Sequence, residues 1–539
     1  MARLIALLTL GSGLLNLWTL LFRLGPRWAP TLEAIFPLEV QHASRFITLV
    51  VGFALIVSSI NIFKRKRRAF LLVLGLSAAS IVFHLTKGLN YEAAAVSVLV
   101  VAALVSTRHE FTVKSGNPDM TSALERAVIA VAVVLAYGVA GFWSLDRRDF
   151  GIDFDVADAL RMTVEYLTLG ADPRLLAHTR HAVWFLDSLN LIALTAIAYT
   201  LSVFYGPTVY RFLTLPRERA HAVEILGRHG RSPLDFFKSW PDKSFFFSPS
   251  RESFVAYRVD HGYAIALGDP VGPAAELEST IDRFRNFCDE QDWRVAFHQT
   301  LPDFAETYRR RGFKLLKVGD DAIVDLERFT LEGSERKSLR HAVSKLERQG
   351  VRAEVVEPPV PEPILAQLKE VSDEWLRLAG HRERRFTLGR FEHDYVRRTP
   401  LFVALDSDGR VLAFVNLIPA YVPGDLAIDL MRRRDRVPNG TMEFLFSKLL
   451  LEYRGRAFRR FNLGLAPMAG FQEGDEASRE ERALHAFFQR FNFLFNYRGL
   501  KQFKGKFATG WEPRYLAYGS ALDLPRFAIA LAAVTRQQA

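Results

Sequence analysis

A chain of 539 residues is long enough for two or three domains. Its single cysteine, Cys288, excludes an intramolecular disulfide and any multi-cysteine metal site. The formal net charge of +11 favours polyanionic partners, either a nucleic acid or an anionic membrane surface.

The first part of the chain is dominated by six apolar segments. A helix of about 20 residues crosses a bilayer core of about 30 Å, and each segment is that long or nearly so. The segments are 4–22, 46–63, 69–87, 92–107, 127–144 and 183–206. We therefore predict a transmembrane region of about six helices over residues 1–210.

The placement of basic residues predicts how this region is oriented. Five consecutive Lys and Arg residues at 64–68 lie between the second and third segments. Cytoplasmic loops carry an excess of positive charge, so this run and the N-terminus are expected inside. The Asp-rich loop 145–182 then falls outside. The sixth segment returns the chain near Pro207, so the C-terminal domain is predicted to be cytoplasmic.

From Arg217 onward, short strands alternate with amphipathic helices. Asp260-His261-Gly262 predicts the turn of a hairpin. The Pro-rich segment 357–363 separates two successive sets of strands and helices of similar size. Two successive rounds predict a duplicated α/β transferase fold, with one subdomain over 217–356 and a second, carrying the active site, over 364–525.

Several common active-site signatures are absent from the sequence: GxxxxGK[ST], a strand–GxGxxG–helix fingerprint, HExxH and GxSxG. The sequence therefore gives no indication of NTP hydrolysis, dinucleotide redox chemistry, zinc hydrolysis or a serine nucleophile elbow.

Between Gly464 and Tyr518, the lysines Lys501, Lys504 and Lys506 alternate with Phe and Tyr before a Trp-Glu-Pro-Arg-Tyr strand. Lysines among aromatic residues are typical of a pocket for an anionic, stacking ligand, such as a nucleic-acid end or a phospholipid head group. An amphipathic strand with a solvated basic edge is the alternative interpretation.

An ordered series of blocks carries a resemblance to a known family over nearly all of residues 230–520. The blocks are PDKSFFF (241–247), ALGDPVG (266–272), RRRGFKLLKVGDDAIVDLERFTLEG (309–333), RKSLRHAVSKLERQG (336–350), RFTLGRF (385–391), AFVNLIPAY (413–421), IDLMRR (428–433), PNGTMEFLF (438–446), FNLGLAP, KQFKGKF and WEPRYL. The soluble half resembles the aminoacyl-phosphatidylglycerol synthases, the lysyltransferase domain of the multiple peptide resistance factors. Asp320 and Glu443 are mild departures from the family's pattern.

The resemblance implies a multi-pass protein of the bacterial inner membrane with a cytoplasmic domain of two tandem GNAT-like acyltransferase folds. Its implied reaction transfers an aminoacyl group, with lysyl as the expected one, from aminoacyl-tRNA to the glycerol hydroxyl of phosphatidylglycerol. The ester is already activated, so no ATP, cofactor or metal is required. The product would reduce negative surface charge and give resistance to cationic antimicrobial peptides. The implied partners are lysyl-tRNA, phosphatidylglycerol and the anionic membrane, with a homo-oligomer left open.

The resemblance also selects site residues. Asp429 and Arg432 match the family's substrate-binding or catalytic pair, with a structural ion pair as the alternative. Asp429 would bind the α-amino group or orient the attacking hydroxyl, and Arg432 would contact phosphate or the carbonyl oxygen. Glu443 is a candidate for the substrate ammonium. The candidates for lipid or tRNA phosphate are Lys504, Lys506 and Arg514.

A basic stripe is predicted on the helix 335–349, where Lys337, His341, Lys345 and Arg348 share one face. Arg336 and Arg340 lie beside them. Such a stripe suits the tRNA backbone or an anionic leaflet, and a merely solvated basic face is the competing interpretation.

Four other functions stay open at this stage. The first is a membrane-tethered acyl-CoA transferase, although Arg309–Lys314 fails the last position of a (Q/R)xxGx(G/A) loop. A Fem-like ligase would share the fold but not the ordered blocks. The third is a lipid flippase with a regulatory soluble domain, and the fourth is an inactive domain that only binds lipid.

Overall fold

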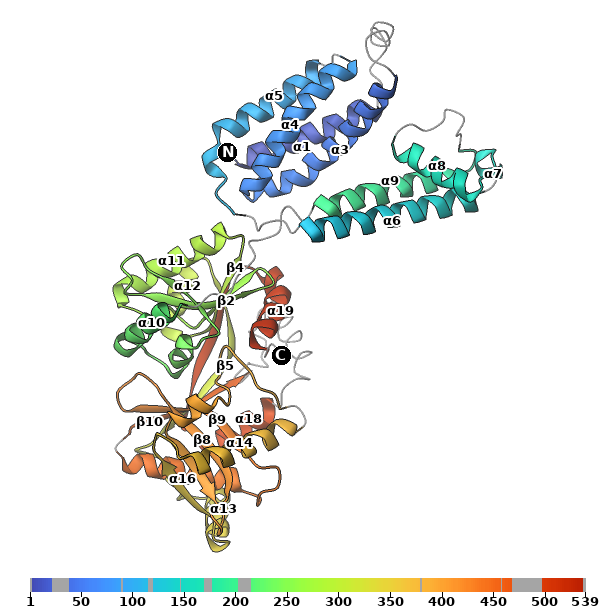
Figure 1. Ribbon diagram of the computed structural model, residues 1–539. Helices are drawn as coiled ribbons and strands as arrows, with labels where there is room; N and C mark the ends of the chain where they lie inside the picture. The colour runs from blue at the N-terminus through green and yellow to red at the C-terminus, as the bar shows by residue number, and fades with distance from the viewer. Residues whose placement is uncertain are drawn as a thin grey trace. The chain divides into compact units, whose positions relative to one another are not determined.

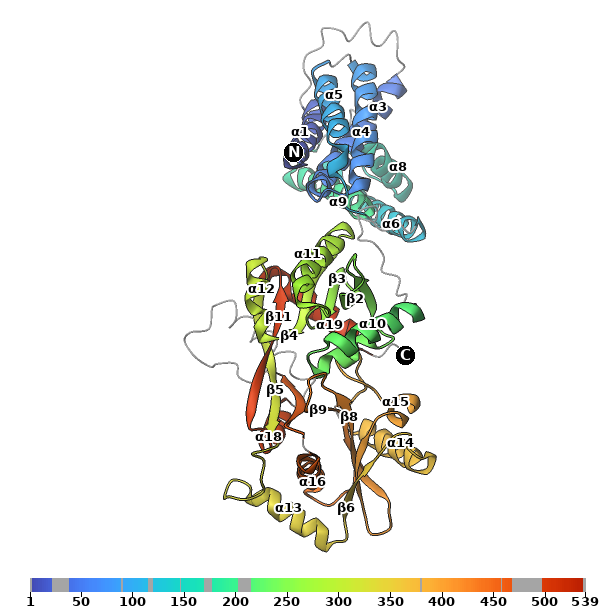
Figure 2. The same ribbon diagram turned by 90° about the vertical axis from the view of Figure 1, so that its left-hand side faces the viewer.

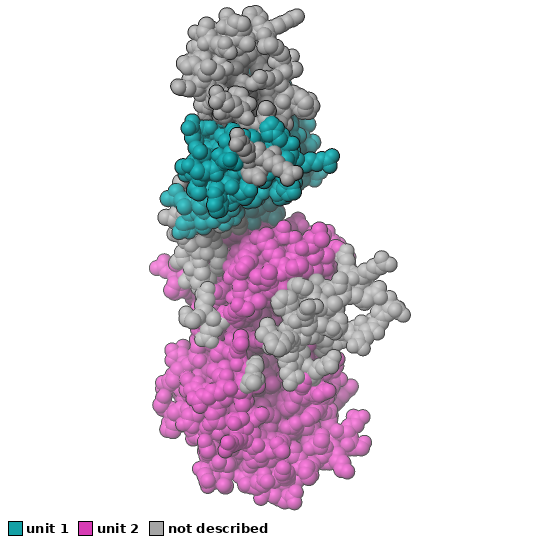
Figure 3. All heavy atoms as spheres, turned by 90° about the vertical axis from the view of Figure 1, so that its right-hand side faces the viewer, with its two compact units in different colours: residues 1–209, 289–292 teal, residues 210–288, 293–539 magenta. Residues whose placement is uncertain are grey.

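The computed structural model describes residues 2–21, 38–88, 91–114, 120–145, 147–168, 177–201, 215–378, 381–456, 458–467 and 497–536. The chain divides into two compact units, shown in different colours in Figure 3. The first unit comprises residues 1–209 with 289–292, and the second comprises 210–288 with 293–539.

The first unit is helical. Its helices are α1 (Ala2–Leu21), α3 (Leu38–Phe63), α4 (Arg67–Gly88), α5 (Tyr91–Ser106), η1 (Arg108–Glu110), α6 (Met120–Ser144), α7 (Arg147–Phe150), α8 (Val156–Leu167) and α9 (Arg180–Leu201). One apolar cluster contains residues of α1, α3, α4 and α5, and another contains residues of α6, α7, α8 and α9; Figure 1 shows these helices. Gly141 permits close packing of α6 on α9, because a Cβ there would lie 1.8 Å from the Phe185 ring.

The described part of each of the six predicted apolar segments overlaps a helix of this unit. Among the described residues, Ala127–Ser144 and Arg180–Thr200 are long and apolar enough to cross a membrane. Three shorter apolar stretches occur at Arg3–Leu15, Val51–Phe63 and Ala94–Ser106. The count of about six spans and the predicted orientation therefore stay predictions.

The second unit is built on one eleven-stranded sheet of order β1-β2-β3-β4-β11-β5-β10-β9-β8-β7-β6. The strands are β1 (Ser244–Phe247), β2 (Phe254–Asp260), β3 (Tyr263–Leu267), β4 (Arg294–Thr300), β5 (Lys314–Asp325), β6 (Arg352–Val356), β7 (Leu401–Leu405), β8 (Val411–Pro419), β9 (Asp425–Arg433), β10 (Arg460–Pro467) and β11 (Gly510–Tyr518). The helices are α10 (Pro216–His229), η3 (Pro233–Ser239), α11 (Ala274–Glu290), η4 (Pro302–Phe304), α12 (Ala305–Arg310), α13 (Lys337–Arg348), α14 (Glu362–Arg377), α15 (His393–Arg397), α16 (Thr441–Gly455), α18 (Tyr497–Gly505), η6 (Ala521–Asp523) and α19 (Leu524–Thr535).

The strand order repeats one motif. In the first half, β2 and β3 are antiparallel, and α11 then connects β3 to its parallel neighbour β4. In the second half, β8 and β9 are antiparallel, and α16 connects β9 to its parallel neighbour β10. This repetition agrees with the predicted duplication and with a GNAT-like α/β fold for the C-terminal part.

The hairpin predicted at Asp260-His261-Gly262 is confirmed. Asp260 pairs with Tyr263 across a two-residue turn. His261 and Gly262 have φ angles of 46° and 70°, the left-handed values that a tight hairpin turn requires. The sequence therefore specifies this turn locally.

The last strand, β11, lies between two strands of the first half of the sheet. Antiparallel pairing connects β11 to β4 on one side and to β5 on the other (Figure 2). Its residues, 510–518, come after the strands of the second half in the sequence. In the sheet, however, they lie among the strands of the first half. The division of this unit at the Pro-rich segment stays a prediction.

Candidate active site

A bulge in β9 determines how Asp429 and Arg432 are presented. Ile428 pairs with Leu417 and Met431 with Val415, so β9 contains one residue more than β8 over this interval. Residues three apart on a regular strand point to opposite faces. The extra residue brings both side chains to one side, where each contacts the segment 381–392 between α14 and α15.

The Asp429 carboxylate is held by two donors. It accepts hydrogen bonds from the Gly389 amide at 3.0 Å and from the Tyr395 hydroxyl at 2.7 Å. The same Tyr395 oxygen accepts from the Asn416 side-chain amide at 2.7 Å. Burial raises the pKa of Asp429 to about 6, and the hydrogen bond from Tyr395 opposes that rise. The site thus presents a carboxylate whose pKa lies close to neutral pH.

The Arg432 side chain is 3% exposed. Its guanidinium donates to the Glu383 carboxylate at 2.8 Å and to the Ser372 hydroxyl, and it lies 5.0 Å from the centre of the Trp375 ring. Glu383 also accepts from the Phe391 amide at 3.2 Å. Arg432 therefore anchors, through Glu383, the same segment whose Gly389 amide binds Asp429.

A second charged cluster forms where β5, β10 and β11 meet. One oxygen of Asp321 accepts from the Arg514 guanidinium at 2.6 and 2.9 Å and from the Asn462 amide at 3.1 Å. The Lys504 ammonium donates to the Leu465 carbonyl at 3.0 Å. Burial lowers the pKa of Lys504 to about 8, and attraction to Asp321 opposes that fall. Two of the predicted phosphate-binding residues thus converge on Asp321.

The third predicted phosphate-binding residue, Lys506, forms an ion pair of 2.7 Å with Glu443 in the first turn of α16. The structure therefore places two predicted substrate-binding residues in direct contact with each other. Lys501 and Lys504 lie on helix α18, and Lys506 lies in the turn that follows it. The alternative of a basic strand is wrong for this segment, whereas the Trp-Glu-Pro-Arg-Tyr strand is confirmed as part of β11.

The basic stripe lies on α13, whose opposite face is buried through Leu339, Ala342, Val343 and Leu346. Lys337, His341 and Arg348 are exposed and Lys345 is half-buried. The guanidinium of Arg340 donates to the Leu331 and Gly333 carbonyls. Arg336 donates to the Lys506 carbonyl and lies 5.6 Å from the centre of the Phe329 ring. Arg336 and Arg340 thus hold neighbouring loops, and their proposed contacts with tRNA or membrane stay predictions.

Some residues around these sites were not selected from the sequence. Glu383 and Tyr395 lie outside the quoted blocks, whereas Asn416 lies within AFVNLIPAY. Asn416 is fully buried, and its side-chain carbonyl accepts from the Leu430 amide at 2.7 Å, inside the bulge. A single Asn within an otherwise apolar strand was the available signal, because a buried amide needs specific partners.

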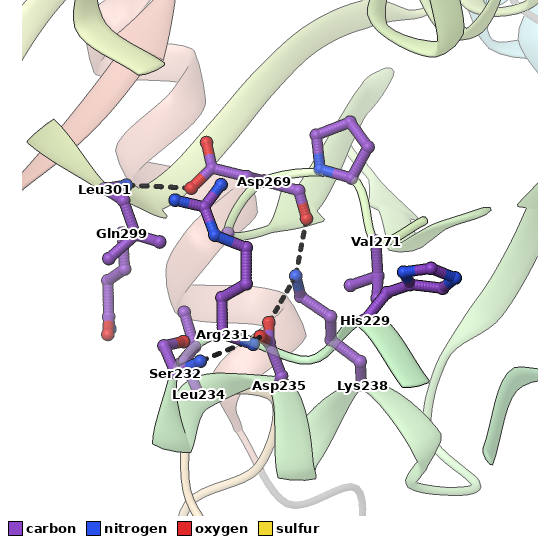
Figure 4. A pocket seen from close by; sticks show the side chains of 12 residues that line it. His229, Arg231, Ser232, Leu234, Asp235, Lys238, Asp269, Val271, Gln299 and Leu301 are labelled. Atoms are coloured by element: carbon purple, nitrogen blue, oxygen red, sulfur yellow. Dashed lines mark hydrogen bonds and ion pairs between the residues drawn. The ribbon is translucent and has the colours of Figure 1, made fainter. Parts of the chain in front are cut away.

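The first half contains a polar hollow, shown in Figure 4. The Lys238 ammonium lies 2.6 Å from the Asp235 carboxylate and donates to the Asp269 carbonyl. The Asp269 carboxylate accepts from the Leu301 amide at 2.8 Å and from the Tyr308 hydroxyl at 3.0 Å. Burial raises the pKa of Asp269 to about 6. This network connects the ALGDPVG block to η3, to the N-cap of η4 and to α12, and accounts for that block structurally.

Within the described part of the chain, no group of three or more His, Cys, Asp or Glu residues could hold a metal ion.

Comparison with known proteins identifies the family. The family described as "Phosphatidylglycerol lysyltransferase, C-terminal" matches residues 223–518, which is more than half of the chain. The chain belongs to this family. The match includes both charged clusters and the α13 stripe.

The relatives carry matching names. Phosphatidylglycerol lysyltransferase of Bacillus subtilis (strain 168) is 26% identical over 478 residues, which is 88% of this chain and 53% of that protein. Its namesake in Staphylococcus epidermidis (strain RP62A) is 31% identical over 294 residues, 54% of this chain and 35% of that protein. The chain thus spans about half, or less, of the length of these curated relatives.

Two solved structures are similar to the second unit. The structure of L-PGS from Bacillus licheniformis has a TM-score of 0.53 and 30% identity, covering 58% of this chain and 94% of that one. The C-terminal domain of a putative lysylphosphatidylglycerol synthetase from Agrobacterium fabrum has a TM-score of 0.53 and 32% identity. This match covers 59% of this chain and 96% of that one.

Proposed function

We propose that this protein transfers an aminoacyl group, with lysyl as the expected donor, from aminoacyl-tRNA to phosphatidylglycerol at the inner face of the bacterial membrane. The proposal is supported by membership of the family and by the names of the relatives. The observation that carries it is the bulge of β9, which presents Asp429 and Arg432 together against one segment.

In the proposed reaction, the terminal glycerol oxygen forms a new bond to the ester carbonyl carbon of the aminoacyl-tRNA. The bond from that carbon to the ribose oxygen breaks, and the hydroxyl proton finally resides on the ribose. Asp429 is suited to accept the proton and return it, because a general base works best with a pKa near the operating pH. Arg432 acts as a positioning residue by fixing Glu383 and the segment that binds Asp429.

The buried Lys504–Arg514–Asp321 cluster and the Glu443–Lys506 pair are proposed to contact the charged ends of the substrates. The exposed part of the α13 stripe is proposed to meet the tRNA backbone or the anionic leaflet. Aminoacylation adds positive charge to the lipid, so the proposed outcome in the cell is greater resistance to cationic peptides.

The deciding experiment is mass spectrometry of lipids from cells that express the full chain. We expect aminoacyl phosphatidylglycerol from the wild type and little or none from Asp429→Asn, which preserves the side-chain shape. If the wild type is expressed in membranes and makes no such lipid, the proposal fails. Treatment of isolated membranes with RNase separates the donors, because acyl-CoA-dependent transfer would survive it.

A further inference from the structure

A group of basic side chains lies next to the segment that binds Asp429. Asp242 connects this group to the segment: its carboxylate lies 2.6 Å from the Lys243 ammonium and accepts from the Phe386 amide at 3.0 Å. Lys243 is 1% exposed, and its ammonium lies 5.4 Å from the centre of the Phe386 ring. The structure thus keeps a buried lysine beside residues 385 and 386.

The charge of Arg385 is poorly compensated. Its pKa is lowered first by burial and then by the neighbouring Arg390 and Arg258, with Asp242 and Glu392 opposing. Its Nε is buried and has no hydrogen-bond partner among the described residues. A buried donor without an acceptor is costly, so this guanidinium is suited to an external anion.

The position of Arg385 relates this group to the candidate active site. Gly389, four residues further along, donates its amide to Asp429 at 3.0 Å. The Arg385 amide itself donates to the carbonyl of Thr535, the last residue of α19, at 3.1 Å. One short segment therefore connects the Asp429 carboxylate, the basic group and the end of α19.

Helix α19 adds an apolar surface. Leu524, Phe527, Ala530 and Val534 form its buried face. Ile529 is 50% exposed, and Ala532 and Ala533, at the same helical face, are partly exposed. Acyl chains gain from such a surface, whereas the ribose-phosphate backbone of an RNA does not. The combination favours a lipid over a tRNA as the source of the anion.

We propose that Arg385 binds the phosphate of phosphatidylglycerol, with Lys243 and Arg258 adding positive potential, so that the glycerol reaches Asp429 and an acyl chain lies along α19. This inference rests on the proposed function and assigns a lipid-phosphate subsite to it. The subsite differs from the Lys504–Arg514–Asp321 cluster, which is left for the other substrate.

The test compares Arg385→Ala, Arg385→Lys and Arg382→Ala in the full chain reconstituted in detergent micelles. Arg382 is exposed and lies in the same segment, so it controls for general charge. We expect Arg385→Ala to raise the KM for phosphatidylglycerol about tenfold or more, because a charge-assisted hydrogen bond is lost. The KM for aminoacyl-tRNA should not change. Arg385→Lys should recover part of the loss, and Arg382→Ala should behave as wild type.

Two readouts that do not depend on turnover complete the test. Binding of dihexanoyl phosphatidylglycerol to the full chain should weaken in Arg385→Ala, while its Tm should stay at or above that of the wild type, because an unpaired buried donor has been removed. A rise in the KM for tRNA alone would assign the anion to RNA and overturn the proposal. A lower Tm with unchanged lipid binding would make Arg385 structural and overturn it as well.

The failure of the proposed function would be distinguishable from the failure of this inference. If the wild type makes no aminoacyl lipid, the proposed reaction is wrong. Direct binding of the short-chain lipid by wild type and Arg385→Ala still decides whether the subsite exists.

Discussion

The Tyr395 hydroxyl donates to the Asp429 carboxylate at 2.7 Å and thereby holds the pKa of that carboxylate below the value that burial alone would produce. The two residues come from different parts of the second half of the sheet unit, α15 and β9. Their contact therefore sets the pH below which the candidate active site should lose activity, and this pH can be measured.

Tyr395→Phe is predicted to shift that limit. The proposed reaction needs the ionised carboxylate, so wild-type activity should fall as the pH drops through about 6. Without the hydrogen bond the pKa of Asp429 rises, and the acid limb of kcat/KM should move to higher pH. The measurement is a pH–rate profile, with Tyr453→Phe on α16 as a control that also removes a buried tyrosine hydroxyl. Unchanged acid limbs in both variants would show that Asp429 does not control the rate.

Gly389→Ala is predicted to disrupt the site without unfolding the sheet. A Cβ at this position would lie 1.9 Å from an Asp429 oxygen, so the carboxylate or the segment must shift. Misplacement on the scale of 1 Å costs on the order of 100-fold in rate. Steady-state kinetics and thermal melting measure the two effects. Gly227→Ala, where an added Cβ meets nothing within 4 Å, is the matched control.

Asp321→Ala is predicted to destabilise the protein strongly. It would leave the Arg514 guanidinium, 4% exposed, without its carboxylate, beside the buried Lys504. Removing one partner of a buried pair costs about 3–5 kcal/mol. Chemical denaturation would measure this cost, and Asp408→Ala on an exposed turn should stay near wild type. A loss below about 1 kcal/mol would contradict the described pairing.

Lys504→Met separates function from structure. A buried ammonium whose pKa is lowered to about 8 by burial is a cost to folding at neutral pH, and methionine removes that charge at similar volume. We expect an equal or higher Tm together with reduced aminoacyl transfer. A lower Tm with normal specific activity would instead make Lys504 a structural residue.

Charge reversal on α13 tests the stripe. Lys337→Glu and Arg348→Glu change exposed side chains that leave the buried face of the helix intact. If they contact RNA phosphates, each should raise the KM for tRNA and reduce the slope of log affinity against log salt by about 0.7 to 0.9. Filter binding at several salt concentrations measures this, with Arg328→Glu, 86% exposed, as the control. Equal slopes for all three variants would favour a solvated face.

The sequence predicted those features that depend on local chemistry. The hairpin at His261-Gly262 follows from residues that tolerate positive φ, and the alternation of strands and helices follows from hydrophobic periodicity. Asp429 and Arg432 were selected through the family pattern. The sequence did not predict that both side chains lie on the same side of β9. That arrangement depends on an extra residue in β9 and on the side chain of Asn416 from another strand.

Long-range pairing accounts for the other differences. The lysines from 501 to 506 read as a basic strand or pocket, yet Lys504 is buried against Leu465 of β10. Arg336 and Arg340 were placed beside the basic stripe by their spacing, but Arg336 donates to the Lys506 carbonyl and Arg340 to the Leu331 carbonyl, in the segment before α13. Helical spacing records which residues share a face and carries no information on the loops that fold back onto it.

The place of β11 between β4 and β5 has a consequence for biosynthesis. During translation, residues 294–325 emerge nearly two hundred residues before the strand that separates β4 from β5. Until then, both strands have an unpaired edge exposed to solvent, and such edges are prone to pair with other chains. Assembly of the sheet is therefore delayed until the synthesis of this unit is almost finished. A chain released before residue 510 lacks β11, keeps these unpaired edges and is expected to be bound by chaperones or degraded by proteases.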